Sequence, residues 1–243
     1  MYSISFVIPT YNRDIKVLRL LNNLDKEISQ LSDHQKANIE ILISDNASSD
    51  NTQNLVKSFS SNNFTINYFR QDINIGFDAN CTFLYEESNN DYVWFFADDD
   101  ILLPGSIYKV MKGIENDPTI LLFSFIQPPE SLERTFSFSN SHELVTNPRQ
   151  AIELIAQYPK ISIYVIKKIN ISAEMHKELN PFIDNGFFWV SMCFSIFGHQ
   201  NGGSICIISE PLAECDAEFN EINFPMKTVK ERYKLFSHPF VIN

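Results

Sequence analysis

The first half of the chain alternates between two patterns of hydrophobic and polar positions. Short runs rich in β-branched and aromatic residues predict strands at residues 4–8, 39–43, 65–69 and 92–96. The last run is apolar at every position, which is typical of a strand in a sheet that is covered on both faces. The four runs therefore predict a buried sheet.

Apolar residues between these runs recur at the spacing of one helix face. The four stripes lie at residues 17–31, 55–59, 77–84 and 107–114. The last stripe follows Pro104, a residue that suits the first turn of a helix. Strands and helices that alternate in this way predict right-handed βαβ units. The expected fold class is therefore α/β, with a mostly parallel central sheet flanked by helices.

The second half of the chain is less regular. We expect strands at residues 119–125, 161–166 and 204–208, and helices at 148–156 and 187–197. Residues 127–142 are rich in Ser, Glu and Pro, a composition that predicts a loop.

The composition excludes some classes of function. The chain has 19 Lys and Arg against 30 Asp and Glu, a net charge of −11. A surface this acidic repels phosphate backbones, so we expect no nucleic-acid partner. The 7 glycines form neither a dinucleotide-binding motif nor a P-loop. Any phosphate chemistry therefore needs a metal ion and side chains.

Cysteine spacing and hydropathy indicate the compartment. The 4 cysteines show no CxxC spacing, so we expect buried free thiols in a reducing environment. The N-terminus has no basic stretch followed by an apolar core, which argues against a signal peptide. The longest apolar stretch, residues 187–198, is too short to span a bilayer. These features predict a cytoplasmic protein.

Polar residues follow each of the first four predicted strands. They lie at residues 9–13, 45–50, 70–76 and 98–100. In an open parallel sheet, ligands bind beyond the carboxyl ends of the strands. We therefore expect these four segments to converge on one edge of the sheet and to form the functional site there.

Three adjacent carboxylates, Asp98, Asp99 and Asp100, are the strongest single feature of this edge. In an extended segment Asp98 and Asp100 would point the same way. A hard divalent cation such as Mg²⁺ or Mn²⁺ would relieve their repulsion and bridge them to a diphosphate. The alternative interpretation is a solvated turn in which Asp100 caps the following helix.

The other segments also have two interpretations. Asp45 could accept a hydrogen bond from a nucleobase, or it could serve as a turn or helix cap. Tyr11 could stack on a base or simply pack. Asn74 and Gly76 could line a ligand or form only a turn. Their joint placement, rather than any one of them, favours a ligand site.

Four motifs together carry a family resemblance. They are FVIPTYNR (6–13), ISDNASSDNT (43–52), RQDINIGFDAN (70–80) and YVWFFADDDILLPG (92–105). In order and spacing, residues 1–116 resemble a family 2 glycosyltransferase with the GT-A fold, in the style of bacterial enzymes that build surface polysaccharides. The resemblance implies a nucleoside-diphosphate sugar donor, Mg²⁺ or Mn²⁺ on a DXD motif, and transfer to an acceptor hydroxyl, usually with inversion.

The resemblance also implies roles for particular residues. Asp45 would read the base, Asp98 would lie near the ribose and sugar, and Asp100, with Asp98, would hold the metal. Further residues would line the nucleotide pocket: Pro9, Thr10, Tyr11, Arg13, Asn74, Gly76 and Asp99.

The catalytic base is less clearly marked, because the resemblance fades after residue 116 and no Glu-Asp pair follows. Asp184 is the candidate, although a lone carboxylate before an apolar helix is also typical of a cap. Glu214 and Asp216 are the fallback candidates. We expect residues 117–217 to form the acceptor-side part of the same domain, and residues 218–243 a C-terminal tail.

The expected partners follow from the resemblance. The donor is expected to be UDP-linked, with CDP, GDP and dTDP left open, and the acceptor a glycan or lipid-linked glycan. A lipid-linked acceptor would bring the protein to the inner face of the membrane as a peripheral protein. Two other functions stay open: a sugar-nucleotide-binding partner subunit without transferase activity, and a metal-dependent nucleotidyltransferase.

Overall fold

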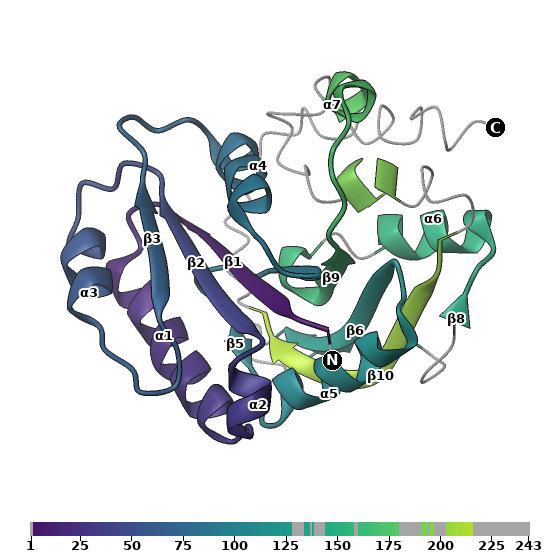
Figure 1. Cartoon of the computed structure of the whole chain (residues 1–243), viewed down its shortest axis with the longest axis horizontal. Helices are drawn as coiled ribbons and strands as arrows, with labels where there is room; N and C mark the ends of the chain where they lie inside the picture. The colour runs from purple at the N-terminus through teal and green to yellow at the C-terminus, as the bar shows by residue number, and fades with distance from the viewer. Residues whose placement is uncertain are drawn as a thin grey trace.

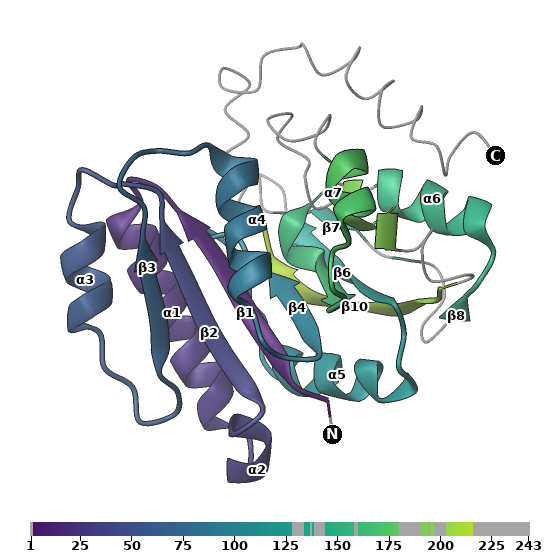
Figure 2. The same cartoon turned by 45° about the horizontal axis from the view of Figure 1, so that its top comes forward.

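A sheet of ten strands organises the part of the chain that the structure describes (Figures 1 and 2). In this computed structural model that part comprises residues 2–127, 134–136, 138, 144–157, 160–179, 191–193, 195–196 and 203–215. The strands are β1 Ile4–Thr10, β2 Ile39–Asp45, β3 Ile66–Arg70, β4 Tyr92–Phe95, β5 Ile101–Leu102, β6 Ile120–Gln127, β7 Arg134–Phe136, β8 Leu144–Val145, β9 Tyr164–Lys167 and β10 Ile205–Glu214.

Helices flank the sheet on both faces (Figures 1 and 2). The α-helices are α1 Asp14–Ser29, α2 Asp33–Lys36, α3 Thr52–Ser58, α4 Phe77–Glu87, α5 Ser106–Gly113, α6 Pro148–Gln157 and α7 Ala173–Leu179. The 3₁₀ turns are η1 Ile114–Asn116 and η2 Ile161–Ile163. Helices α1 and α3 pack together, whereas α4 packs against β1 and β2.

The strand order is β3-β2-β1-β4-β9-β6-β10-β5. Strands β3, β2, β1 and β4 are parallel neighbours, so their carboxyl ends meet at one edge. Strand β9 is antiparallel to both β4 and β6. The chain order reverses at β1, which lies between β2 and β4, and such a switch point is where open α/β sheets bind ligands.

The structure confirms the α/β class and the four strands and four helices of the first half. Three details were wrong. Residues 161–163 form the turn η2 rather than a strand, because a short apolar run looks the same in either conformation. Strand β7 lies inside the predicted loop 127–142. Phe77 is 42% exposed, because it is the first residue of α4 and the buried face begins one residue later.

The remaining expectations have different outcomes. Of the predicted helix 187–197, residues 191–193 and 195–196 are described, and they are helical. The tail 218–243 lies outside the described residues. The division at residue 116 stays a prediction, while the sheet continues across it through the pairing of β4 with β9 and of β5 with β10.

The structure also describes the state of the cysteines and the length of the helices. Cys81, Cys193, Cys206 and Cys215 are buried, and none of them forms a disulfide. Within the described residues, every helix is too short or too polar to cross a membrane.

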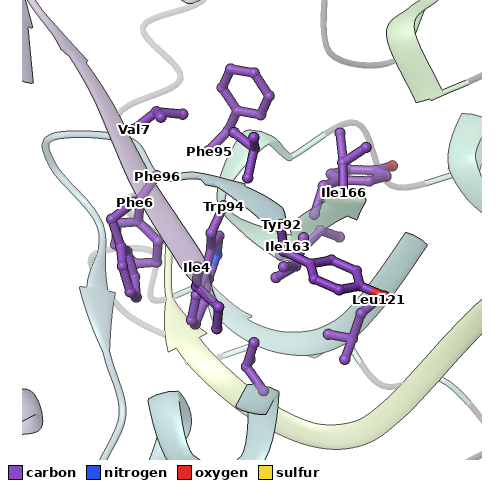
Figure 3. Packing of buried hydrophobic residues seen from close by; sticks show 14 of the residues in the cluster. Ile4, Phe6, Val7, Tyr92, Trp94, Phe95, Phe96, Leu121, Ile163 and Ile166 are labelled. Atoms are coloured by element: carbon purple, nitrogen blue, oxygen red, sulfur yellow. The ribbon is translucent and has the colours of Figure 1, made fainter. Parts of the chain in front are cut away.

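Trp94 lies at the centre of the buried core (Figure 3). Its ring stacks on Phe6 with 4.6 Å between centroids, and it forms T-shaped contacts with Phe96 and Phe123, with centroids 5.8 and 5.5 Å away. Its indole N–H donates to the carbonyl oxygen of Ser162 at 2.8 Å. Trp94 therefore connects β1, β4, β6 and η2 by packing and by one buried hydrogen bond.

We expect Trp94→Ala to lower the free energy of unfolding by about 3–5 kcal/mol, because it removes a fully buried aromatic side chain and leaves a cavity. Urea denaturation followed by circular dichroism would measure the loss. Ile15→Ala is the control: this side chain is 68% exposed, and we expect a change within about 0.5 kcal/mol. Equal losses in the two variants would contradict the central role of Trp94.

Candidate functional site

The sheet register brings the first three predicted loops together. Thr10 lies beside Asp45 on neighbouring strands, and Asp45 lies beside Arg70. The amide of Asn46 donates to the Thr10 carbonyl at 2.9 Å. The segments that follow β1, β2 and β3 therefore begin side by side at one edge, as the sequence predicted.

The segment after β1 is fixed by the segment after β2. The amide of Asn12 donates to the Ser48 hydroxyl at 2.8 Å, and the Asn12 side-chain oxygen accepts from the Ser49 amide at 2.7 Å. Asn12 and Ala47 both have positive φ angles, 53° and 63°, so each segment turns sharply here. The turn leaves Tyr11 45% exposed, and its stacking on a base stays a prediction.

Asp45 is completely buried, and both of its carboxylate oxygens are engaged. One oxygen accepts from the Ser48 amide at 2.7 Å. The other accepts from the Tyr68 hydroxyl and from Arg70 Nη1, both at 2.6 Å. The burial of Tyr68 and the charge of Asp45 raise the pKa of the Tyr68 phenol. Base reading by Asp45 stays a prediction.

The segment after β3 is held by Asn46, a residue that the sequence analysis did not select. The Asn46 amide nitrogen donates to Asn74 Oδ1 at 2.9 Å and to the Gly76 carbonyl at 3.2 Å, and its oxygen accepts from the Ile75 amide at 2.8 Å. Gly76 has a φ of 87°, a conformation that favours glycine. Asn74 and Gly76 thus belong to one loop, which hydrogen bonds with Asn46 hold beside the ends of β1 and β2.

The aspartate triplet forms a turn, which was one of the two conformations considered from the sequence, rather than an extended segment. The Asp100 amide donates to the Ala97 carbonyl at 3.3 Å, which closes the turn. Because the chain bends here, the outer two carboxylates have different partners. Asp98 accepts from the Thr10 hydroxyl at 2.7 Å, and Asp100 accepts from the Ser162 hydroxyl.

The buried carboxyl group of Asp98 has an unusual environment. Burial raises its pKa to about 7, although nearby Arg13 acts in the opposite direction; Asp99 raises the pKa further and the Thr10 hydrogen bond lowers it. Arg13 Nη1 lies 3.6 Å from the Asp98 carboxylate. A group that loses solvation in this way is one for which a bound cation would favour the charged form.

The middle carboxylate, Asp99, is paired with cations from α1 and the residue before it. Arg13 donates a hydrogen bond to the Asp99 carboxylate, and Lys16 Nζ lies 3.5 Å from it. Arg19 donates to the Asp99 backbone carbonyl. These contacts join the triplet to the start of α1, and the role of Asp99 in nucleotide binding stays a prediction.

The carboxylate pair fits a hard cation in its donor chemistry. Mg²⁺ binds through one or two carboxylates together with substrate phosphates and waters, so a cluster of protein ligands is not required. Within the ranges that the structure describes, no group of three or more His, Cys, Asp or Glu could hold a metal on its own. Asp98 and Asp100 stay the two predicted ligands, and a diphosphate with waters would have to supply the rest.

Of the three candidates for the catalytic base, only Glu214 lies within the described residues. Asp184 and Asp216 fall on residues that are not described. Glu214 is the exposed last residue of β10 and pairs in the sheet with Ile101, the residue after the triplet. Its place near the triplet keeps it as a candidate.

Four residues at the site were given no role from the sequence. Asn46 and Arg70 lie in the segments predicted to form the site, whereas Tyr68 and Ser162 lie outside them. Tyr68 and Arg70 are two apart on β3, so their shared face was a usable signal for a common partner. Asn46 and Ser162 gave no signal, because their partners are fixed only by the folded structure.

The fold and the polar loops at one edge of the sheet together indicate the class of protein. The structure resembles GT-A glycosyltransferases. Its TM-score against S. aureus TarS 1–349 in complex with UDP-GlcNAc is 0.70, at 16% identity, over 96% of this chain and 64% of that one. Its TM-score against the mannosyltransferase PcManGT from Pyrobaculum calidifontis, in complex with GDP-Man and Mn²⁺, is 0.60, at 14% identity, over 98% and 63%.

The family is shown by sequence. Residues 5–178 match the model for glycosyl transferase family 2, so the chain belongs to that family. It is 37% identical over 227 residues to the abequosyltransferase RfbV of Salmonella typhimurium, over 87% of this chain and 66% of that protein. It is 28% identical to a Campylobacter jejuni GalNAc(5)-diNAcBac-PP-undecaprenol beta-1,3-glucosyltransferase, over 56% of this chain and 43% of that protein. The chain thus spans less than two thirds of these relatives.

The raised pKa of Asp98 predicts a pH-dependent stability. Between its ordinary value of 3.8 and about 7, the folded state holds a proton that the unfolded chain has lost. The free energy of unfolding should therefore fall as the pH rises through this window, by up to about 1.4 kcal/mol per pH unit. Asp98→Asn resembles the neutral acid and does not titrate, so we expect it to flatten this dependence.

Urea denaturation of both proteins across this pH range would measure the difference. Asp33→Asn is the control, because Asp33 is exposed on α2, at the opposite end of the strands (Figure 1). Identical slopes for Asp98→Asn and the unsubstituted protein would show that Asp98 ionises normally.

Proposed function

We propose that this chain transfers a sugar from a nucleoside-diphosphate sugar to an acceptor hydroxyl in the synthesis of a bacterial surface polysaccharide. The observation that carries the proposal is the turn of Asp98, Asp99 and Asp100 at the switch point of the sheet, in which Asp98 and Asp100 are buried and Asp98 and Asp99 are bonded to the segment after β1. Membership of glycosyl transferase family 2 supports it. The names of the two relatives, a sugar transferase each, also support it.

The donor is proposed to be UDP-linked, as in the TarS complex with UDP-GlcNAc. The mannosyltransferase neighbour is named with GDP-Man, so the nucleotide varies within this fold. The 37% identity to an abequosyltransferase makes an abequosyl-like sugar an early choice for testing. A panel of UDP, CDP, GDP and dTDP sugars therefore covers the donors to be compared.

The metal is proposed to be Mg²⁺ or Mn²⁺, held by Asp100 and Asp98. The mannosyltransferase neighbour with Mn²⁺ supports this choice. When bound, the cation would neutralise charge on the diphosphate leaving group. The protein's own part is to hold the two carboxylates in place, Asp98 through Thr10 and Asp100 through Ser162. Interactions that strengthen as charge develops on the leaving group accelerate the reaction.

The acceptor reaction is proposed to be a single displacement with inversion, with a glycan or lipid-linked glycan as acceptor. An acceptor hydroxyl has an alcohol-like pKa, so a positioned carboxylate must take its proton. Asp184 is the proposed base, with Glu214 and Asp216 as alternatives. A lipid-linked acceptor would place the reaction at the inner face of the membrane, with the protein attached peripherally.

Asp100→Asn tests the donor and metal part of the proposal. A ligand that binds only the folded state raises the melting temperature. We expect a nucleotide sugar from the panel to raise the melting temperature of the unsubstituted protein when Mn²⁺ is present, and to have no such effect on Asp100→Asn. Asp33→Asn, on the distant helix α2, should respond like the unsubstituted protein. A donor that stabilises Asp100→Asn equally well would remove Asp100 from the metal site.

Asp184→Asn tests the proposed base. Loss of a general base typically lowers the rate by about 10²–10⁴-fold. We expect a fall of this size in kcat, with donor binding unchanged, because Asn keeps the shape of the side chain but cannot accept the proton. Steady-state kinetics with the donor found in the thermal-shift panel would measure it. Near-normal turnover would move the assignment to Glu214 or Asp216, which Glu214→Gln and Asp216→Asn would then separate.

A further inference from the structure

Ser162 connects the second half of the chain to the aspartate triplet. It lies in η2, is completely buried, and is 62 positions away from Asp100 in sequence. Its hydroxyl accepts a hydrogen bond from the Ala97 amide at 2.9 Å. The same hydroxyl donates to Asp100 Oδ2. Both side-chain bonds of Ser162 therefore end on the segment that carries the triplet.

The direction of these two bonds is fixed by chemistry. The Ala97 amide can only donate, so the serine oxygen must accept from it. The single hydroxyl proton is then left for the Asp100 carboxylate. Ser162 thus sets both the backbone position at the start of the turn and the orientation of the carboxylate at its end.

The position of Ser162 is itself well determined. Its backbone carbonyl accepts from the Trp94 indole at 2.8 Å, and Trp94 is held in the aromatic core. Cys215, the residue after β10, lies beside Asp100, and burial and the Asp100 carboxylate raise the pKa of its thiol. The Asp100 carboxylate is therefore held from the second half of the chain by Ser162 in η2, the turn that precedes β9.

We propose that Ser162 is a positioning residue for the metal–nucleotide site. It acts through Asp100 and through the turn that begins at Ala97, and it does not itself touch substrate. The inference rests on the proposed function, since the group that it positions is the proposed metal ligand. Carboxylates that bind metals are generally oriented by hydrogen bonds from a second layer of residues, and loss of such a partner typically costs about 10–100-fold in metal affinity or activity.

Ser162→Ala tests the inference against a matched control, Ser124→Ala. Ser124 is also completely buried, and its hydroxyl accepts from the Phe138 amide at 2.9 Å. Both variants therefore lose one buried hydroxyl that accepts from a backbone amide, but only Ser162→Ala loses a bond to the triplet. Thermal melts in the absence of ligand would check that the two variants lose similar stability.

The first measurement is calorimetric titration of Mn²⁺ in the presence of UDP. We expect Ser162→Ala to bind Mn²⁺ at least about 10-fold more weakly than the unsubstituted protein, and Ser124→Ala to bind it normally. Unchanged Mn²⁺ affinity in Ser162→Ala overturns the inference. Equal weakening in both variants also overturns it, because a general loss of packing would then be the cause.

The second measurement does not depend on any ligand. Hydrogen exchange at the Ala97 amide should be faster in Ser162→Ala than in Ser124→Ala or the unsubstituted protein, because the amide loses its acceptor. Unchanged exchange overturns the inference. If the unsubstituted protein fails to bind Mn²⁺ with UDP or with the other nucleotides of the panel, the proposed function fails, and the exchange rates alone decide whether Ser162 holds the turn.

Discussion

The hydrogen bond from the Thr10 hydroxyl to Asp98 joins the end of β1 to the turn after β4, and the arrangement of the site depends on it. The bond is possible because β1 and β4 are parallel neighbours in a register that pairs Val7 with Phe95, three residues before each partner. The Asp98 carboxyl group is buried, and this burial raises its pKa to about 7, although the Thr10 hydrogen bond acts in the opposite direction. Packing thus makes the charged form of Asp98 unfavourable, and a bound cation would stabilise that form.

Local charge balance explains how an acidic chain can present three adjacent carboxylates. The chain carries a net charge of −11, yet Arg13, Lys16 and Arg19 all lie within reach of Asp99. These cations belong to α1 and the residue before it, so the helix after β1 stabilises the turn after β4. The middle carboxylate is paired within the protein, while the outer two face Thr10 and Ser162. The turn therefore gives the middle carboxylate cationic partners and the outer two carboxylates buried hydroxyl partners.

Local patterns predicted the fold well, whereas contacts between distant segments lay beyond them. The runs before Thr10 and Asp45 were identified as strands because their apolar spacing is local, and parallel ends then predicted that their loops meet. The conformation of Asp98 to Asp100 was not predicted, because an isolated acidic run is equally compatible with a turn or an extended segment. Ser162 was placed in a strand, since nothing near it in sequence indicates that its partners are Ala97 and Asp100.

The antiparallel strand β9 gives the second half of the chain a direct influence on the donor side. In a purely parallel sheet, the strand next to β4 would have its carboxyl end at the site. Because β9 runs the other way, the turn η2 that precedes it reaches the same edge, and Ser162 enters beside the triplet. The Trp94 indole then fixes this turn against the core. The reversal of one strand thus supplies the hydroxyl that orients Asp100, and changes in the second half should reach the proposed metal site through that contact.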